Sequence, residues 1–287
     1  MEQQKKSLTI TLCVILASIM LAFTLTPYFT VKPAYAQRYS DDTFNGGGTA
    51  TEVDEIIEFD SYTVLEDCHV SSGDMPSYGD LSEERDNTCS PVAGANICGY
   101  YDRWKTNLLP DFTPGANMGT GYCYFNLSGQ TPVQNCIGTL YNYMGTNVGG
   151  DGTTLTGFKN GLLKYVTEQG YSLTYQSVRT SNTTVNMDTV RQAFNNDKVV
   201  LLCFSNYNLI SGFALNDDSA QICCNAYSAG HMMVTYRFKT IAYYKDGVNF
   251  RTDTYFYIVS GYDTELEGYT VLFKNSTLTE ALIVSIT

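Results

Sequence analysis

Residues 87–104 read Asn-Thr-Cys-Ser-Pro-Val-Ala-Gly-Ala-Asn-Ile-Cys-Gly-Tyr-Tyr-Asp-Arg-Trp. Pro91 suits the first turn of a helix, where its missing backbone N–H removes no hydrogen bond. The apolar residues that follow recur at the spacing of one helical face: Ala93, Ile97, Tyr100, Tyr101 and Trp104. We therefore predict a helix from Cys89 to about Trp104, with Cys89 at its N-terminus.

Two more helices are expected downstream. Residues 154–169 place apolar side chains on one face and end before Gly170, a residue type that favours a helix stop. Residues 186–196 show a shorter amphipathic pattern. Beyond these, apolar segments predict strands at residues 199–204, 231–238, 241–245, 255–260, 269–273 and 281–286. Helices followed by an antiparallel sheet predict an α+β fold.

The composition limits the chemistry. Apolar residues make up 44% of the 287 residues and charged residues 16%, so a buried core is expected and wholesale disorder is excluded. The formal net charge of -12 argues against a nucleic-acid partner, because phosphate binding relies on Lys and Arg. The only two histidines are His69 and His231, which excludes a three-His zinc site. Cys68-His69 has no further ligand pair at suitable spacing, so no metal site is expected.

Residues 1–36 have the features of a secretory signal peptide. Lys5 and Lys6 precede an uncharged segment at residues 7–31, and Ala34-Tyr35-Ala36 matches a small-x-small cleavage motif. The alternative is an uncleaved anchor, since the uncharged segment exceeds about 18 residues. We expect cleavage, because Thr and Pro residues interrupt the apolar run. The protein is then secreted or at the cell surface, and it meets the membrane only through its export signal.

The exported chain divides into two parts. Residues 37–75 are expected to form a polar leader or linker, because residues 37–56 are rich in Gly, Thr and Asp. Residues 56–65 alternate well enough for one strand within it. Residues 76–287 contain no repeat and no composition break, so a single domain is expected there.

The cysteine count does not settle the redox state. Cleavage after residue 36 removes Cys13 and leaves eight of the nine cysteines. An even number in an exported chain suggests disulfides. The remaining chain is nevertheless long enough to be stable without them, and the adjacent Cys223 and Cys224 cannot easily bond to one another. The disulfide pairing stays open at this point.

Cys89 has the position of a nucleophile. The unpaired N–H groups and the positive dipole at a helix N-terminus favour thiolate over thiol, and they can help to hold an oxyanion. A thiol nucleophile also needs a base. His231 lies 142 residues downstream, after Gly230 and at the start of a predicted strand. This separation falls within the range of about 130–150 residues between Cys and His in papain-like enzymes.

The quoted stretch resembles the nucleophile helix of bacterial papain-like cysteine peptidases. The most similar group is related to double-glycine leader peptidases, which typically have a Cys-x-Pro-x-Ala helix and a later Gly-His followed by an apolar strand. Residues 140–147, 152–154 and 161–165 also look like the middle of exported members of this group. The resemblance covers about residues 76–287, and its specific parts are the Cys89 helix and the Gly230-His231 strand.

The resemblance implies a papain-like fold with an N-terminal helical half and a C-terminal antiparallel sheet. It implies that Cys89 is the nucleophile and that His231 is the general base, which later becomes the acid for the leaving amine. The substrate would be a peptide or protein, and neither a metal nor an organic cofactor is implied.

Two positions depart from the pattern of this group. The third catalytic residue is normally Asn or Asp, whereas the expected segment here reads Val259-Ser260-Gly261-Tyr262-Asp263. We take Asp263 as the orienting residue, with Ser260 as the alternative. Relatives also place an oxyanion-binding Gln shortly before the nucleophile, but residues 80–88 contain none. Asn87 is the only amide there and is the candidate oxyanion donor.

The function expected from these features is a secreted cysteine peptidase that forms an acyl-enzyme. Two alternatives stay open. The first is a secreted binding or surface protein that keeps the scaffold without activity, because the Gln is missing and the third residue is unusual. The second is another acyl transfer, such as amidase or transglutaminase chemistry, since a fold does not fix a reaction. The sequence leaves the oligomeric state open.

Overall fold

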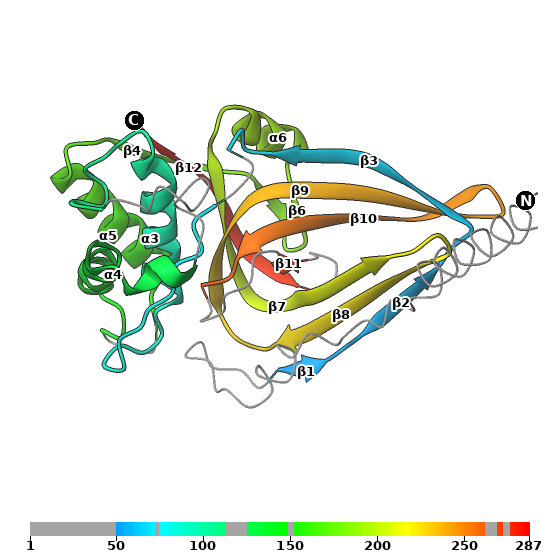
Figure 1. Cartoon of the computed structure of the whole chain (residues 1–287), viewed down its shortest axis with the longest axis horizontal. Coiled ribbons are helices and arrows are strands. Elements are labelled where there is room, and N and C mark those ends of the chain that lie inside the picture. Colours follow the sequence, from blue (N-terminus) through cyan, green and yellow to red (C-terminus); the bar gives the residue numbers. More distant parts are fainter. Residues whose placement is uncertain (1–49, 73–74, 113–124, 149–151, 262–268, 272–275) are drawn as a thin grey trace, which may run out of the picture. The chain divides into compact units, whose positions relative to one another are not determined.

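The computed structural model of the chain describes residues 50–72, 75–112, 125–148, 152–261, 269–271 and 276–287. The expected signal peptide and Asp263 lie outside the described residues. All described residues belong to the unit Tyr35–Thr287. They combine helices with a sheet whose strand pairings are antiparallel (Figure 1). The mixed helix-and-sheet class is therefore confirmed.

The described residues contain four α-helices. They are α3 (Cys89–Asp102), α4 (Thr131–Met144), α5 (Leu155–Glu168) and α6 (Met187–Asn195), and a short 3-10 helix, η1 (Phe125–Gly129), precedes α4. The three predicted helices are confirmed as α3, α5 and α6, and α3 begins at Cys89 as expected. The starts of α5 and α6 follow from their caps, because the side chains of Thr154 and Asn186 accept backbone hydrogen bonds of 3.0 and 3.1 Å. Helix α4 is not among the predicted helices.

The strands form one large sheet and one small one. The large sheet contains β1 (Thr51–Glu52), β2 (Glu55–Glu58), β3 (Ser61–His69), β4 (Leu173–Ser177), β7 (Val199–Leu215), β8 (Ser219–Tyr227), β9 (His231–Lys245), β10 (Val248–Val259), β11 (Tyr269–Val271) and β12 (Thr277–Ile286). β5 (Arg179–Ser181) and β6 (Thr184–Val185) pair separately. The main order is β1-β8-β7-β11-β10-β9-β3, while β2 pairs with β8 and β12 joins β4 to β7.

The long strand β7 closes part of the sheet on itself. Its residues Val200–Phe204 pair with β9, and its later residues Tyr207–Leu215 pair with β8. β11 pairs with both β7 and β10, and β10 pairs with β9. The pairings of β7, β11, β10 and β9 therefore form a ring, which fixes the start of β9 between neighbours.

Several strands differ in extent from their predictions. The predicted strands at 231–238 and 241–245 are one strand, β9, and residues 199–204 are only the first part of β7. The predicted strand at 56–65 is divided between β2, which pairs with β8, and β3, which pairs with β9. β8 is not among the predicted strands. Apolar runs mark only the buried parts of a strand, whereas the backbone ladder continues through polar and exposed residues.

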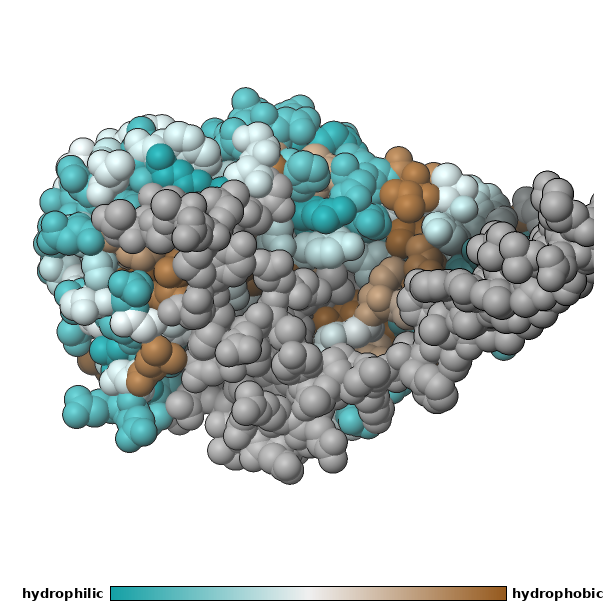
Figure 2. Space-filling model, viewed as in Figure 1, coloured by the Kyte–Doolittle hydropathy of each residue, from teal (hydrophilic) through white to brown (hydrophobic). Residues whose placement is uncertain are grey.

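Residues 37–75 are expected to form a leader or linker, and the structure corrects this expectation for residues 51–69; residues 37–49 and 73–74 lie outside the described residues. β1, β2 and β3 lie within this segment and pair with β8 and β9 of the main sheet. The side chains of β3 are mostly exposed, including Val64 (42%) and Leu65 (55%). Figure 2 shows apolar side chains at the surface of the strand-bearing part. In β1, β2 and β3 most side chains are exposed, so these strands join the sheet mainly through their backbone.

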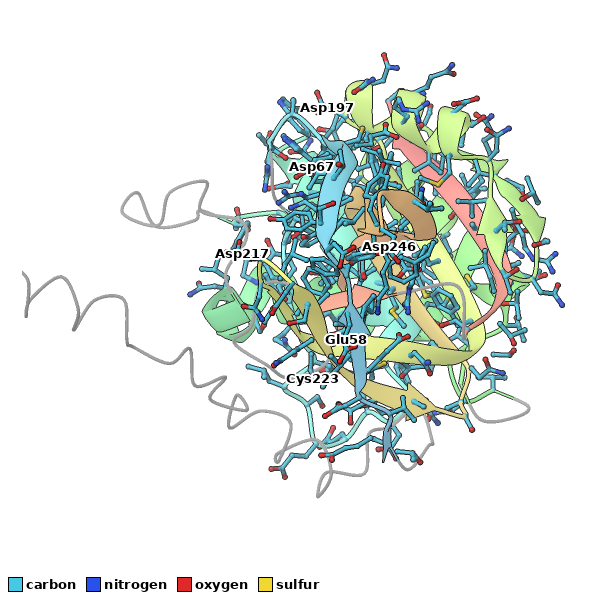
Figure 3. The ribbon with its side chains drawn as sticks, turned by 90° about the vertical axis from the view of Figure 1, so that its right-hand side faces the viewer. Glu58, Asp67, Asp197, Asp217, Cys223 and Asp246 are labelled. Carbon is cyan, nitrogen blue, oxygen red and sulfur yellow. The ribbon has the colours of Figure 1, made fainter. Side chains whose placement is uncertain are left out.

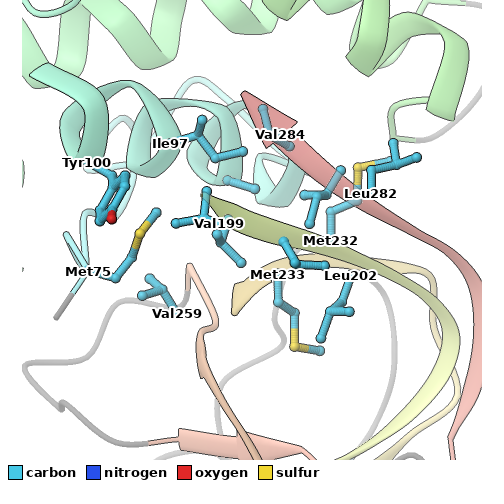
Figure 4. Packing of buried hydrophobic residues seen from close by; sticks show 14 of the residues in the cluster. Met75, Ile97, Tyr100, Val199, Leu202, Met232, Met233, Val259, Leu282 and Val284 are labelled. Atoms are coloured by element: carbon cyan, nitrogen blue, oxygen red, sulfur yellow. The ribbon is translucent and has the colours of Figure 1, made fainter. Parts of the chain in front are cut away.

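The main core lies between α3, α4 and α5 and the strands β7, β9 and β12. Ile97 of α3, Val199 of β7 and Val284 of β12 belong to this cluster of buried residues (Figure 4). The end of α3 is also tied to the sheet, because the Tyr101 hydroxyl donates to the Val284 carbonyl at 2.7 Å. The helix that carries Cys89 is therefore fixed against the strands along its length. Among the described residues, no helix is long and apolar enough to cross a membrane.

Candidate functional site

The N-terminus of α3 meets the start of β9. The Ser90 hydroxyl donates to Met232 Sδ at 3.2 Å. The residue after the end of β10 also packs against the first turn of α3, since a Cβ built on Gly261 would lie 3.0 Å from Val92 Cγ1. Gly261 has φ +75°, a backbone conformation that also favours glycine. These contacts place the first residue of α3 beside the first residue of β9, so Cys89 faces His231.

The His231 side chain lies beside the Cys89 thiol and lowers its pKa. Burial raises the pKa of Cys89, but the hydrogen bond and charge of His231, the Met232 backbone N–H and the Ser90 side chain together lower it more. The pKa of the Cys89 thiol therefore falls from the ordinary 9.0 to about 7. A thiol with this pKa is about half thiolate at pH 7, and Cys89 is partly exposed. It therefore has the properties of a reactive cysteine.

Other cysteines show the opposite shift. Burial raises the pKa of the Cys203 and Cys224 thiols to about 12. Burial also raises the pKa of Cys68 and of Cys98. Among the described cysteines whose pKa is shifted, only that of Cys89 is lowered. The environment of the α3 N-terminus therefore distinguishes this thiol from those of the core.

The second contact of His231 defines its tautomer. His231 is 4% exposed, and its Nε2 lies 2.7 Å from the Ser260 carbonyl oxygen. A carbonyl oxygen can only accept, so Nε2 carries the proton and donates. Nδ1 is then unprotonated in the neutral ring and is the nitrogen left to face the thiol. This tautomer allows His231 to take a proton from Cys89.

Of the two candidate orienting residues, the structure brings Ser260 to His231. It does so through the main-chain carbonyl of Ser260 and not through the serine hydroxyl. Asp263 lies outside the described residues. A neutral carbonyl fixes the ring orientation, but it stabilises an imidazolium less than a carboxylate does.

Replacing Ser260 by alanine is expected to leave the reactivity of Cys89 within about threefold of wild type. The substitution keeps the carbonyl that accepts the His231 hydrogen bond. The rate of Cys89 alkylation at pH 6–8 measures this effect. A loss of more than about tenfold, in a variant of unchanged Tm, would assign the orienting role to the hydroxyl.

Two stacked tyrosine rings lie on one face of the imidazole. The Tyr207 ring stacks on His231 with centroids 5.2 Å apart and planes at 24°. Tyr227 stacks on Tyr207 at 4.9 Å and 13°. The two tyrosines are cross-strand partners on β7 and β8, and both are buried. Neither tyrosine can be identified from the sequence alone, because the stack on His231 depends on the register of three strands.

Tyr207 is expected to act as a positioning residue for His231. Replacing it by leucine removes a ring that restrains the imidazole and stabilises its protonated form, an interaction worth about 0.5–2 kcal/mol. We expect the pH midpoint of Cys89 alkylation to rise by about 0.5–1 unit. Tyr207→Phe keeps the ring and should restore the wild-type midpoint. Equal midpoints in all three proteins would contradict this role.

The structure gives Asn87 a partner away from the thiol. Its Nδ2 donates to Asn147 Oδ1 at 2.8 Å, and Asn147 also accepts from the Gly152 backbone N–H at 2.7 Å. Asn87 itself has φ 58°, the left-handed conformation that Asn tolerates better than most residues. The amide thus anchors the loop after α4 to the residues before Cys89.

The first turn of α3 offers another source of oxyanion donors. The Thr88 side chain makes no capping hydrogen bond to this helix. The backbone N–H groups at the start of α3, including that of Cys89 itself, point along the helix axis toward its N-terminus. Together with the helix dipole, they favour negative charge at this position.

Acidic side chains are dispersed over separate elements. Figure 3 shows Glu58, Asp67, Asp197, Asp217 and Asp246 at separate positions. Asp67 pairs with Arg237 at 2.6 Å, and Asp197 accepts hydrogen bonds from Ser71. In the part of the chain that the structure describes, no group of three or more His, Cys, Asp or Glu residues could hold a metal ion.

No protein-family model matches the sequence, and no curated protein matches it. The function therefore rests on the site itself. That site consists of a thiol of lowered pKa at a helix N-terminus, a buried imidazole of defined tautomer and a stacked tyrosine. Such an arrangement can attack a carbonyl carbon and return a proton to the leaving group.

Proposed function

We propose that the protein is an exported cysteine peptidase of papain-like fold that hydrolyses peptide bonds through an acyl-enzyme at Cys89. The observation that carries this proposal is the placement of the His231 imidazole beside a helix-N-terminal thiol whose pKa is lowered to about 7. The fold supports it in coarser terms, since the thiol begins a helix and the imidazole begins an antiparallel strand.

The first half-reaction follows from the two ring nitrogens. Nδ1 of His231 takes the thiol proton while Nε2 remains bonded to the Ser260 carbonyl. The sulfur attacks the peptide carbonyl, and the developing oxyanion is held by backbone N–H groups of the α3 N-terminus. The imidazolium then protonates the leaving amine, which departs and leaves a thioester on Cys89.

The second half-reaction reverses these roles with water. His231 takes a proton from a water molecule, whose oxygen attacks the thioester carbonyl. The thiolate leaves, the acid product is released, and the Cys89–His231 pair is restored. An amidase would follow the same steps on a different amide, and a transglutaminase would replace water by an amine.

A protein that only binds peptides would not require a reactive thiol. The lowered pKa of Cys89 among cysteines of raised pKa is the observation that favours the enzyme over this alternative. The neutral orienting carbonyl weakens the stabilisation of the imidazolium but keeps the base in position. The proposal therefore includes activity without a carboxylate in the orienting role.

Alkylation with limiting iodoacetamide tests the reactive pair directly. At pH 6 a thiol of pKa about 7 has about 100 times the thiolate fraction of one at 9.0. The lower nucleophilicity of a less basic thiolate offsets about tenfold of this. We expect Cys89 to react about tenfold faster than an ordinary exposed thiol, with a midpoint near pH 7. Slow, equal labelling of all cysteines, mapped by mass spectrometry, would refute the proposal.

Turnover separates hydrolysis from other acyl transfers. The protein is incubated with a mixture of peptides of varied sequence, with and without an added primary amine. New peptide termini that form only when Cys89 is present indicate a peptidase. Release of ammonia from side-chain or terminal amides indicates an amidase, and incorporation of the added amine indicates a transferase. Reactive Cys89 without any of these products would contradict peptide hydrolysis.

Export is tested independently. Expression of the full chain in a bacterial host, followed by fractionation and N-terminal sequencing, should give a product that begins at Gln37 outside the cytoplasm. A product that retains Met1 in the cytoplasmic fraction would contradict the export signal. This outcome would leave the proposed chemistry of Cys89 unaffected.

A further inference from the structure

Helices α3 and α4 approach each other closely at Gly94. A Cβ built on Gly94 would lie 3.0 Å from Leu140 Cδ1 and 3.0 Å from Met144 Cε. These distances show that the small residue lets α4 side chains reach the backbone of α3. One helical turn beyond Gly94 along α3 is Cys98, and one turn before Leu140 along α4 is Cys136.

The two cysteines at this next level of the helix pair are neighbours in the core. They are 0% and 1% exposed, and burial and the nearby Cys136 thiol raise the pKa of Cys98. The Tyr165 hydroxyl on α5 donates to the Leu108 carbonyl at 2.7 Å, and burial together with the nearby Cys136 and Cys98 raises the pKa of Tyr165. The sulfur pair is therefore enclosed by α3, α4 and α5.

We propose that Cys98 and Cys136 form a disulfide that joins α3 to α4 in the exported protein. Disulfides require Cα atoms about 4.4–6.8 Å apart, and the close approach at Gly94 brings facing residues of two helices toward this range. In the structure both cysteines are free thiols. The inference rests on the proposed export, because an extracellular or periplasmic compartment sustains disulfides, but not on the proposed peptidase activity.

The bond forms by exchange with an external disulfide. One thiolate attacks that disulfide, forms a mixed disulfide and releases one thiol. The second cysteine then displaces the other half as a second thiol. Two S–H bonds of the protein are lost and one S–S bond is gained, while the external disulfide takes up two electrons and two protons.

The order of events follows from burial. Exchange requires a thiolate that an oxidant can reach, and burial raises the pKa of Cys98 well above its ordinary value in the folded protein. The bond therefore forms before α3 and α4 have fully docked, and docking then encloses it. Once formed, it is protected from reductants in the native state.

The cross-link would act on the helix that carries the candidate nucleophile. Cys98 lies on the same helix as Cys89, and the bond closes the chain between α3 and α4 into a loop. A disulfide that closes a loop of about 40 residues should stabilise the folded protein enough to raise its Tm by about 10 °C. The position of α3 relative to α4 would then persist on heating.

Refolding of the full chain in a buffer of reduced and oxidised glutathione tests this bond. Free thiols are blocked with one alkylating reagent in denaturant, disulfides are reduced, and the released thiols are labelled with a second reagent. We expect the second label on Cys98 and Cys136, identified by fragment ions. Recovery of both as free thiols from the folded protein would overturn the proposal.

Matched variants separate the bond from ordinary packing. The Tm of the wild-type protein should fall when it is unfolded and refolded under reductant. In Cys136→Ala, Cys98 should be a free thiol, and refolding under reductant should leave the Tm of this variant unchanged. Cys203→Ala removes another buried thiol and should leave both the cross-link and this fall unchanged. A wild-type Tm equal under oxidising and reducing conditions would also overturn the proposal. Peptidase activity enters none of these readouts.

Discussion

Cys89→Ala is expected to lose peptide hydrolysis by about 10⁴-fold or more, because the substitution removes the atom that forms the acyl-enzyme. The backbone of α3 should be unaffected, since alanine favours helices and Cys89 occupies the partly exposed first position. Substrate binding should persist, so a peptide ligand should bind the variant with little change in Kd. Initial rates and equilibrium binding measure the two effects separately.

A second cysteine provides the control for this result. Cys203→Ala removes a buried thiol whose pKa lies at about 12, so it should keep most of the activity at a lower Tm. Cys89→Ser keeps the size of the side chain but replaces the thiolate by a hydroxyl of much higher pKa, and it should be as inactive as Cys89→Ala. If Cys89→Ala were as active as the wild-type protein, Cys89 would not be the nucleophile.

His231→Ala is expected to slow turnover by about 10²–10⁴-fold through loss of the general base and acid. It should also change Cys89 itself. Burial is the largest influence on the Cys89 pKa and raises it, so without the two contributions of His231 the pKa should rise toward or above 9.0. The sign is therefore upward, and alkylation at pH 6 should lose the rate advantage of Cys89. The pH profile of alkylation between pH 5 and 10 measures this shift.

The other histidine is the matched control for this variant. His69 is exposed on β3, and its Nδ1 lies 2.7 Å from the carbonyl of its neighbour Val70. His69→Ala should leave both turnover and the alkylation midpoint near pH 7 unchanged. If His69→Ala and His231→Ala had equal effects, or if neither moved the midpoint, the pairing of His231 with Cys89 would be wrong.

The local parts of the site can be predicted from the sequence. A proline in the first turn and apolar residues at helical spacing place Cys89 at the start of α3. His231 is one of two histidines and begins an apolar strand. These features depend on neighbours in the chain, so no tertiary information is needed. The same kind of signal exists for α4, where Val133, Ile137, Leu140 and Met144 share one buried face before Gly145.

The remaining parts depend on contacts between distant segments. The Tyr207 stack requires β7 to pair with β9 near Phe204 and with β8 at Tyr227. The inclusion of β3 in the sheet depends on backbone pairing with β9, because its side chains are mostly exposed. Local alternation predicts a strand at residues 56–65, but it does not show which strand pairs with it, and it says nothing of the Tyr207 stack. Pairing between strands far apart in the chain is therefore what sequence reasoning lacks here.

The contact between His231 and the Ser260 carbonyl has a consequence for how such sites evolve. Every amino acid supplies a main-chain carbonyl, so selection on this contact acts on the path of the backbone rather than on the identity of one side chain. Any small residue that fits the buried position 260 preserves it. Substitutions by such small residues should then have little effect on the orientation of His231. A sequence pattern that requires an amide or carboxylate at this position would fail to detect proteins that orient the imidazole through a main-chain carbonyl.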